Sequence, residues 1–348
     1  MLEKWLYSMS PSYRLICLVG LLSLLHGDIA FCDDLREIQW IGLGPIPVVN
    51  QSPIQLLFLQ PIPDRAEVLP GGRKALGLNT AVTNTLVSKS SGNYSGIVDM
   101  EMVRTELDFR AGIHPRLELG ISLAVAYSYG GVMDRSIRDV EDFFGDPRKA
   151  RIEEDPGGYE YQVKKGGETF IGGRKRSSGI GNLAFRIKGK IGEESTYSPC
   201  LSARLALKLP IGHDDRALGT GKPDLGIGVL LQKEIKGLNV YLNADLIFPG
   251  DAFDQVGVSV HQFYSFVVGG EYTLTPQFSV VPQFRYTSRP FRNTGLDMLD
   301  RRIYDFMLGV NYRTNRGIFI QVGGVEDFHD SCDAGADITF YLNIGRYF

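Results

Sequence analysis

Charged side chains stand at every second position between residues 103 and 111. Arg104, Glu106, Asp108 and Arg110 alternate there with mostly apolar neighbours. Because side chains at alternate positions of a β-strand point to the same side, these four would form one charged face. Such a face could select or conduct a solute, or its charges could pair with one another and close the space around them.

The same alternation recurs along the chain. Arg186, Lys188 and Lys190 would place three bases on one strand face, which raises the local positive potential and hints at a preference for anions. If the strands close into a barrel of modest girth, bases and acids could equally pair across the shared interior. The candidate interior charges are Arg104, Glu106, Asp108, Arg110, Arg186, Lys188, Lys190, Arg204, Lys208, Asp245, Arg285 and Asp305.

Histidine, a common general acid or base, is scarce after the first 32 residues. Of His114, His213, His261 and His329, only His213 precedes two aspartates, so it could serve a barrel enzyme that hydrolyses lipids or peptides. The alternative is a solvated loop histidine, because no serine in a suggestive context accompanies it. No cysteine or histidine cluster has metal-ligand spacing. We therefore expect no catalytic residue, no metal and no cofactor, with the hydrolase as the alternative.

These charges must be presented by strands, and the period-two pattern indicates where the strands lie. Segments of about ten residues that alternate in this way are the signature of a transmembrane barrel. An even number of strands leaves both ends of the chain at one rim, as in bacterial single-chain barrels. The pattern predicts twelve strands at 73–87, 100–112, 117–128, 179–191, 200–209, 224–235, 238–248, 261–274, 278–287, 302–313, 318–325 and 336–348.

Connections of two lengths alternate between these segments. Short ones such as 236–237 and 275–277 contain the glycine and proline that turns require. Transmembrane barrels have short periplasmic turns and longer outer loops, so both termini should be periplasmic. On this topology Cys200 and Cys332 lie at opposite rims and cannot form a disulfide. The long connections are 88–99, 129–178, 210–223, 249–260, 288–301 and 326–335.

The longest connection, 129–178, has a pattern of its own. Met133, Ile137, Val140 and Phe144 recur with the spacing of one helical face, which predicts a short amphipathic helix. The helix could cover the mouth of the barrel or line an apolar ligand site, or it could pack on the rim for structure alone. The charged, glycine-rich stretch 146–176 that follows is expected to be mobile.

The start of the chain has the anatomy of a secretory signal. An apolar run at 15–25 is too short to span a bilayer, and small residues precede the Cys32–Asp33 bond, so residues 1–32 are predicted to be a cleaved signal peptide. An uncleaved anchor and a lipid-modified Cys32 are the alternatives. Residues 33–72 are rich in proline and lack the strand pattern. They could form a periplasmic clasp or a plug inside the lumen, and residues 73–348 would form the barrel.

The end of the chain points to a cellular location. Residues 337–348 alternate between polar and apolar and stop on Phe348. This ending resembles the closing-strand signal that the barrel-assembly machinery reads in outer-membrane proteins, although Arg346 stands where that signal usually has an apolar side chain. The resemblance implies the outer membrane of a Gram-negative bacterium, with membrane lipid and the assembly machinery as partners.

Several short motifs resemble a known family. Residues 50–53, 68–73, 131–134 and 143–145 look like the domain-of-unknown-function 3187 family of Gram-negative bacteria. Residues 209–226 are also similar to barrels named as outer-membrane proteins of phenol-degradation pathways. The resemblance implies an outer-membrane barrel and supplies no established reaction or substrate.

Composition agrees with this class of protein. The chain has 41 glycines, 16 tyrosines, 19 phenylalanines and a net charge of −3, which gives no indication of a nucleic-acid partner. We expect an all-β, monomeric, up-and-down transmembrane barrel of about twelve strands. Its expected function is a passive channel or transporter-like protein for a small or partly apolar solute. A barrel enzyme and a structural or adhesive barrel are the alternatives.

Overall fold

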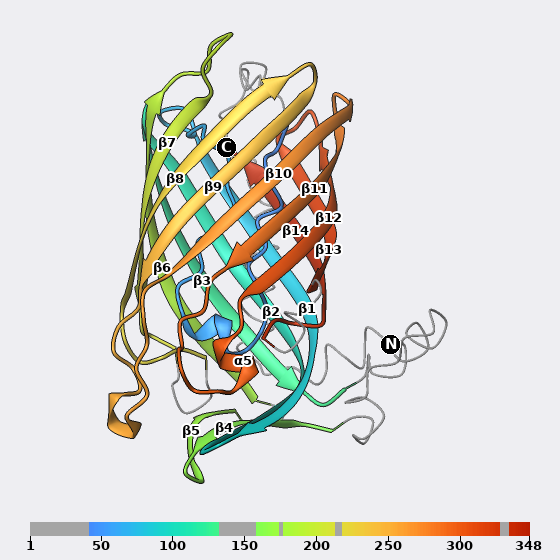
Figure 1. The fold of residues 1–348 in the computed structure, drawn as a ribbon. Coiled ribbons are helices and arrows are strands. Elements are labelled where there is room, and N and C mark those ends of the chain that lie inside the picture. Colours follow the sequence, from blue (N-terminus) through green and yellow to red (C-terminus); the bar gives the residue numbers. More distant parts are fainter. Residues whose placement is uncertain (1–41, 132–157, 174–176, 213–217, 328–333) are drawn as a thin grey trace.

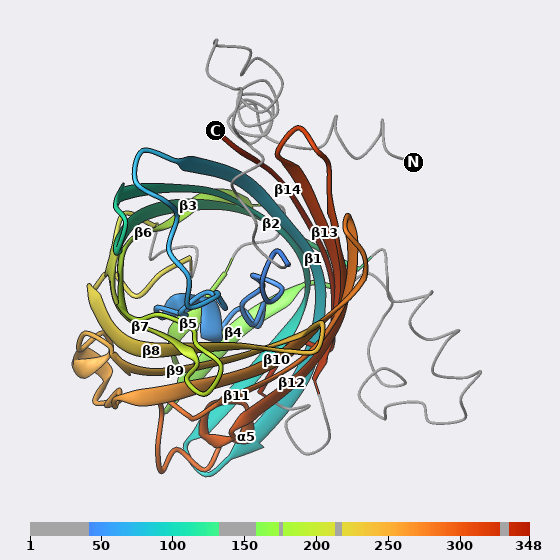
Figure 2. The ribbon, with the colours of Figure 1, turned by 90° about the horizontal axis from the view of Figure 1, so that it is seen from above.

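The computed structural model describes residues 42–131, 158–173, 177–212, 218–327 and 334–348. The strands form one antiparallel sheet, and β1 pairs with both β2 and β14, so the sheet closes on itself (Figures 1 and 2). β4 pairs with β2, and β5 pairs with β4, but neither is part of the closed ring of strands. Twelve strands therefore form the barrel, and the predicted fold class is confirmed. The barrel strands are β1 (Lys74–Ser91), β2 (Tyr94–His114), β3 (Leu117–Tyr129), β6 (Ser177–Gly192), β7 (Cys200–Leu209), β8 (Asp224–Ile235), β9 (Leu238–Phe248), β10 (Phe263–Thr275), β11 (Phe278–Thr287), β12 (Ile303–Arg313), β13 (Ile318–Asp327) and β14 (Ile338–Tyr347).

The burial of alternate side chains is the reverse of that in a soluble barrel. On β7, Arg204 and Lys208 are 7% and 2% exposed, whereas Leu205 and Leu207 are 43% and 37% exposed. Soluble proteins bury the leucines and expose the charges. A polar interior with an apolar exterior is the arrangement that a bilayer requires. None of the helices in the described ranges is long and apolar enough to cross a membrane.

The predicted long connection at 88–99 is wrong. β1 continues to Ser91 and β2 begins at Tyr94, with only Gly92 and Asn93 between them. Gly92 has a φ of +56°, which a two-residue hairpin turn needs and which glycine adopts without strain. The two strands therefore extend beyond their neighbours as a paired arm.

Part of the stretch expected to be mobile is an ordered hairpin. β4 (Glu160–Lys165) and β5 (Glu168–Gly172) are joined by two glycines with positive φ, and β4 pairs with β2 over residues 94–99. The arm of β1 and β2 thus supplies an edge on which the hairpin can form. The predicted helix with Met133, Ile137, Val140 and Phe144 lies outside the described residues, as does the predicted signal peptide.

The two rims of the barrel differ. At the terminal rim, β1 begins beside the end of β14, and short turns join the other strands. At the opposite rim, which we call the long-loop rim, lie β4, β5, η4 (Asp254–Val256) and α5 (Asp297–Asp300) (Figure 1). Residues of α5, β4 and β5 share one apolar cluster with η2 (Gln55–Leu57), which belongs to the chain ahead of β1.

A candidate pore and the segment that occupies it

Residues 42–72, which we call the N-terminal segment, run through the interior of the barrel (Figure 2). The first leg starts near the terminal rim, where the backbone N–H groups of Leu43 and Gly44 donate to Glu271 of β10, each at 3.0 Å. The segment turns at η2, within the apolar cluster that η2 shares with α5, β4 and β5 and that we call the long-loop cluster. It then returns to Leu69, whose N–H donates to Glu118 of β3 at 2.7 Å. The interior is therefore partly filled along its length.

Amide side chains of the wall bind the backbone of the segment. The Gln283 amide accepts from the N–H of Ile46 at 3.0 Å and donates to the carbonyl of the same residue at 3.3 Å. Asn243 makes the same two contacts with Asp64, both at 2.8 Å. Each amide thus forms the same pair of hydrogen bonds, to one N–H and one carbonyl, that a neighbouring antiparallel strand would form. These bonds hold the backbone of the segment and do not depend on its side chains.

Several predicted interior bases also hold the segment. Arg285 bonds to Asp305 through Nε at 2.7 Å and donates to the carbonyl of Val48 at 2.8 Å. Lys208 lies 2.8 Å from Asp224 and donates to the carbonyl of Leu57 at 2.7 Å. Each base thus combines a carboxylate on the wall with a backbone carbonyl of the segment.

Arg204 follows the same rule. Its guanidinium bonds to both carboxylate oxygens of Asp245, at 2.6 and 2.5 Å, and donates to the carbonyl of Ile62 at 2.5 Å. Both partners lie within the barrel. The bidentate geometry is the strongest form of this ion pair, so the second leg is anchored firmly to the wall.

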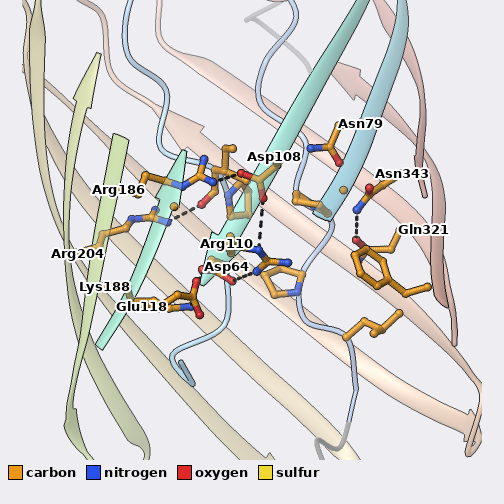
Figure 3. Close-up of a pocket in the computed structure, with 18 residues that line it drawn as sticks. Asp64, Asn79, Asp108, Arg110, Glu118, Arg186, Lys188, Arg204, Gln321 and Asn343 are labelled. Atoms are coloured by element: carbon orange, nitrogen blue, oxygen red, sulfur yellow. Dashed lines mark hydrogen bonds and ion pairs between the residues drawn. The ribbon is translucent and has the colours of Figure 1, made fainter. Parts of the chain in front are cut away.

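Four more of the predicted charges lie at one place in the interior, where Arg110, Arg186 and Lys188 surround Asp108 and Asp64 of the segment (Figure 3). Arg110 lies 3.6 Å from Asp64 and 3.4 Å from Asp108, and Arg186 is hydrogen-bonded to Asp108. Lys188 lies 2.7 Å from Asp64. Burial raises the pKa of Asp64, but Lys188 and Arg110 outweigh it and hold that pKa below its usual range.

The bases on β6 have acidic partners. Besides Asp64, Lys188 lies 3.5 Å from Glu118, and near the terminal rim Lys190 lies 2.9 Å from Glu193. On β2, Arg104 pairs with Glu106. Since each of the three bases has a carboxylate partner, the run Arg186, Lys188 and Lys190 is largely neutralised as a source of positive potential.

Two cavities remain between the segment and the wall. The charged cavity, with about 680 Å³ of empty space including its opening to solvent, has Asp108, Arg110 and Arg186 on one side (Figure 3). Its opposite side is formed by amides, and prolines of the segment complete it. A search for charged residues overlooks these amides, although they occupy the inward-facing positions of their strands. They are Asn79, Gln321 and Asn343.

The second cavity, which we call the apolar cavity, has about 760 Å³ of empty space counted in the same way. Phe58, Leu59 and Leu218 line it together with small residues of β3, β6 and β7, and most of the lining is apolar. Four charged side chains also line it, namely Arg104, Glu106, Arg186 and Lys208. Ile62 and Arg186 line both cavities. The two cavities therefore adjoin, and Arg186 stands at their common boundary.

A chain of aromatic rings connects the apolar cavity with the long-loop rim. Phe58 contacts Phe291 with ring centroids 5.7 Å apart, and Phe291 contacts Phe253 at 5.8 Å. Phe253 contacts Phe170 of β5 at 5.6 Å, and Phe170 contacts Tyr94 at 6.5 Å. These rings belong to the long-loop cluster, so the boundary between cavity and rim is apolar.

The other candidate residues either line neither cavity or lie outside the described residues. Phe348 exchanges backbone hydrogen bonds with Lys74 at 2.8 and 3.1 Å, which joins the end of the chain to the start of β1. His213, His329 and Cys332 lie outside the described residues. Cys200 is a buried free thiol. In the described ranges, no group of three histidine, cysteine, aspartate or glutamate side chains could hold a metal ion.

A closed antiparallel barrel with buried charges and an apolar outer face defines a transmembrane β-barrel. Residues 37–347 match the model of the family described as protein of unknown function (DUF3187), and the chain belongs to that family, as its motifs suggested. A search of curated proteins finds no match.

One solved structure supports the fold, and a second is more remote. The COG4313 outer membrane channel from Pseudomonas putida F1 is 17% identical with a TM-score of 0.55, over 83% of this chain and 100% of that one. The toluene transporter TbuX from Ralstonia pickettii is 10% identical with a TM-score of 0.39, over 80% and 90%. At such identities the first comparison supports the barrel fold alone, and the second is too remote to add to it.

Proposed function

We propose that this protein is a monomeric outer-membrane channel through which small or partly apolar solutes diffuse passively. The terminal rim faces the periplasm and the long-loop rim faces outward, because short turns and both chain ends are periplasmic in bacterial barrels. In this proposal the N-terminal segment acts as a plug that narrows the lumen. The DUF3187 family has no described function, so the proposal rests on the interior of the barrel.

The observation that carries the proposal is the pair of adjoining cavities. The apolar cavity borders the aromatic cluster of the long-loop rim, and the charged cavity continues from it past Ile62 and Arg186. A solute that enters among the outer loops would meet a mostly apolar lining first and a more polar one second. That order suits a molecule with an apolar body and a polar group.

The paired charges support a neutral solute over a selected ion. Asp64, Asp108 and Glu118 oppose Arg110, Arg186 and Lys188 through contacts within 4 Å. An ion would have to compete with partners that are already in place. The balanced network leaves the interior polar without a dominant sign.

Planar-bilayer recording tests the proposal. Purified protein should give small, reproducible conductance steps, and deletion of residues 33–72 should enlarge them several-fold because the lumen loses its contents. Heat modifiability on gels would show that the deleted form is still a barrel. If neither form conducts, the channel proposal fails.

A further inference from the structure

Three amide side chains form a row across neighbouring strands at the charged cavity. Asn343 of β14 is directly opposite Gln321 of β13, which is opposite Asn311 of β12. Asn343 Nδ2 donates to Gln321 Oε1 at 2.8 Å, and Gln321 Nε2 donates to Asn311 Oδ1 at 3.0 Å. All three side chains are buried, and Asn343 is only 4% exposed.

The direction of this row is fixed by its far end. Asn311 Nδ2 contacts the carbonyl of Gly44 at 3.1 Å and the carboxylate of Glu271 at 2.9 Å. A carbonyl only accepts, and this carboxylate already accepts the backbone N–H groups of Leu43 and Gly44. Asn311 must therefore present its NH₂ group to them and its oxygen to Gln321. The same reasoning turns the NH₂ of Gln321 toward Asn311 and the NH₂ of Asn343 toward Gln321.

The row consequently ends on an acceptor. Asn343 Oδ1 is buried, and no hydrogen-bond partner for it exists among the residues that the structure describes. Asn79 is directly opposite Asn343 on β1 and accepts at its Oδ1 from the hydroxyl of Tyr341 at 2.8 Å, but its Nδ2 forms no hydrogen bond to Asn343 Oδ1. An unpaired buried acceptor is costly to leave unfilled.

Gly77 leaves space in front of this acceptor. A Cβ atom at position 77 would lie 3.2 Å from Asn343 Oδ1, and both residues line the charged cavity. Because position 77 has no side chain, no Cβ atom crowds this buried oxygen on that side of the cavity. The amide row supplies its own orientation, so a molecule in the cavity needs only to bring a donor.

We propose that the charged cavity is a binding site for a small neutral solute that donates a hydroxyl or N–H hydrogen bond to Asn343 Oδ1. A hydrocarbon has no donor for this oxygen, and a carboxylate would oppose it with a second acceptor. Each base of the cavity already has a carboxylate within 4 Å, so an ion would have to compete with these partners. This inference specifies the solute of the proposed channel and rests on that function for its biological meaning.

The site can be blocked without disturbing the amide row. Gly77→Ala would set a methyl group against Asn343 Oδ1, while Asn343→Leu would remove the acceptor altogether. Gly324→Ala on β13 is a matched control, because the nearest atom to its added Cβ would be the carbonyl oxygen of Thr339 at 3.9 Å. None of these three positions has the positive φ that would strain an alanine.

The test compares benzyl alcohol with benzyl methyl ether, which share a body but differ in the donor. Ligand-observed NMR titrations on the folded protein in detergent would give both affinities. We expect wild type and Gly324→Ala to favour the alcohol roughly three- to tenfold, the usual net worth of one hydrogen bond. Gly77→Ala and Asn343→Leu should abolish the preference. Equal affinities in wild type, as expected if only water fills the site, would overturn the inference, as would a preference that survives both variants.

This experiment separates the inference from the channel proposal, because equilibrium binding requires no transport. A protein that binds the alcohol selectively but never conducts would refute the channel and support the site. A conducting protein that binds both probes equally would refute the site alone.

Discussion

Glu271 is the acceptor that fixes the first leg of the N-terminal segment, and its replacement should release that leg. The side chain is fully buried and accepts from the N–H groups of Leu43 and Gly44, from the hydroxyl of Tyr241 at 2.8 Å and from Asn311. Glu271→Gln keeps the shape but is neutral and has only one acceptor oxygen, so both backbone N–H groups lose a charged partner and one of them loses its acceptor. Such a hydrogen bond contributes about 1.5–3 kcal/mol.

This loss corresponds to a roughly 10- to 100-fold larger population of the detached leg. Hydrogen exchange followed by mass spectrometry reports that population, because exchange requires local opening. Peptides that cover residues 42–50 should exchange faster in Glu271→Gln, while barrel strands remain protected. Glu234→Gln is the matched control, since Glu234 accepts only from the turn at Gly237 among its described contacts. Unchanged exchange of residues 42–50 in a folded Glu271→Gln barrel would refute the assigned role.

Three further perturbations test other contacts of the segment. Because the pKa of Asp64 lies below its usual value of 3.8, its ion pairs stabilise the segment at all higher pH values. Exchange protection of residues 60–69 should therefore stay constant from pH 8 to 5 and fall only as the pH drops below that value. Ala66 and Cys200 belong to one buried apolar cluster with Leu230, so we expect Ala66→Cys to form a disulfide on oxidation, visible in a non-reducing peptide map. Phe58→Ala removes a ring packed between two others at the apolar boundary and should raise single-channel conductance and lower thermal stability.

Each of these has a control and a contradicting outcome. Protection that declines already between pH 8 and 5 would contradict the lowered pKa of Asp64. An Ala66→Cys, Cys200→Ser double variant should give no linkage, and a linkage absent from the single variant would contradict the path of the second leg. Phe248→Ala, on the lipid-facing side of β9, should leave conductance unchanged, so an equal effect of both phenylalanine changes would remove the boundary role of Phe58.

The barrel could be predicted from sequence because alternation determines which side of a strand each residue faces. Their alternate positions in the sequence are enough to place Arg204 and Lys208 in the interior, because this prediction needs no knowledge of what lies opposite them. The same alternation places the neutral amides of Asn343 and Gln321 in the interior, but a search limited to charged residues does not find them. Their role depends on register across β12, β13 and β14, which single strands do not reveal.

The contents of the lumen could not be predicted in the same way. The proline-rich N-terminal segment has no period, because its backbone bonds to side chains such as Gln283 and Asn243 and not to a neighbouring strand. The balance of charge around Asp64 likewise requires contacts between residues more than 100 positions apart in the chain. By contrast, the Gly92–Asn93 turn was recognisable as a two-residue hairpin signal.

Conductance of the purified protein in planar bilayers tests the central claim most directly. The proposal predicts small steps for the full barrel and steps several times larger after deletion of residues 33–72, with both proteins heat-modifiable on gels. The same small steps in both forms would contradict the role of the segment as a plug. Silence from both folded barrels would contradict the channel itself.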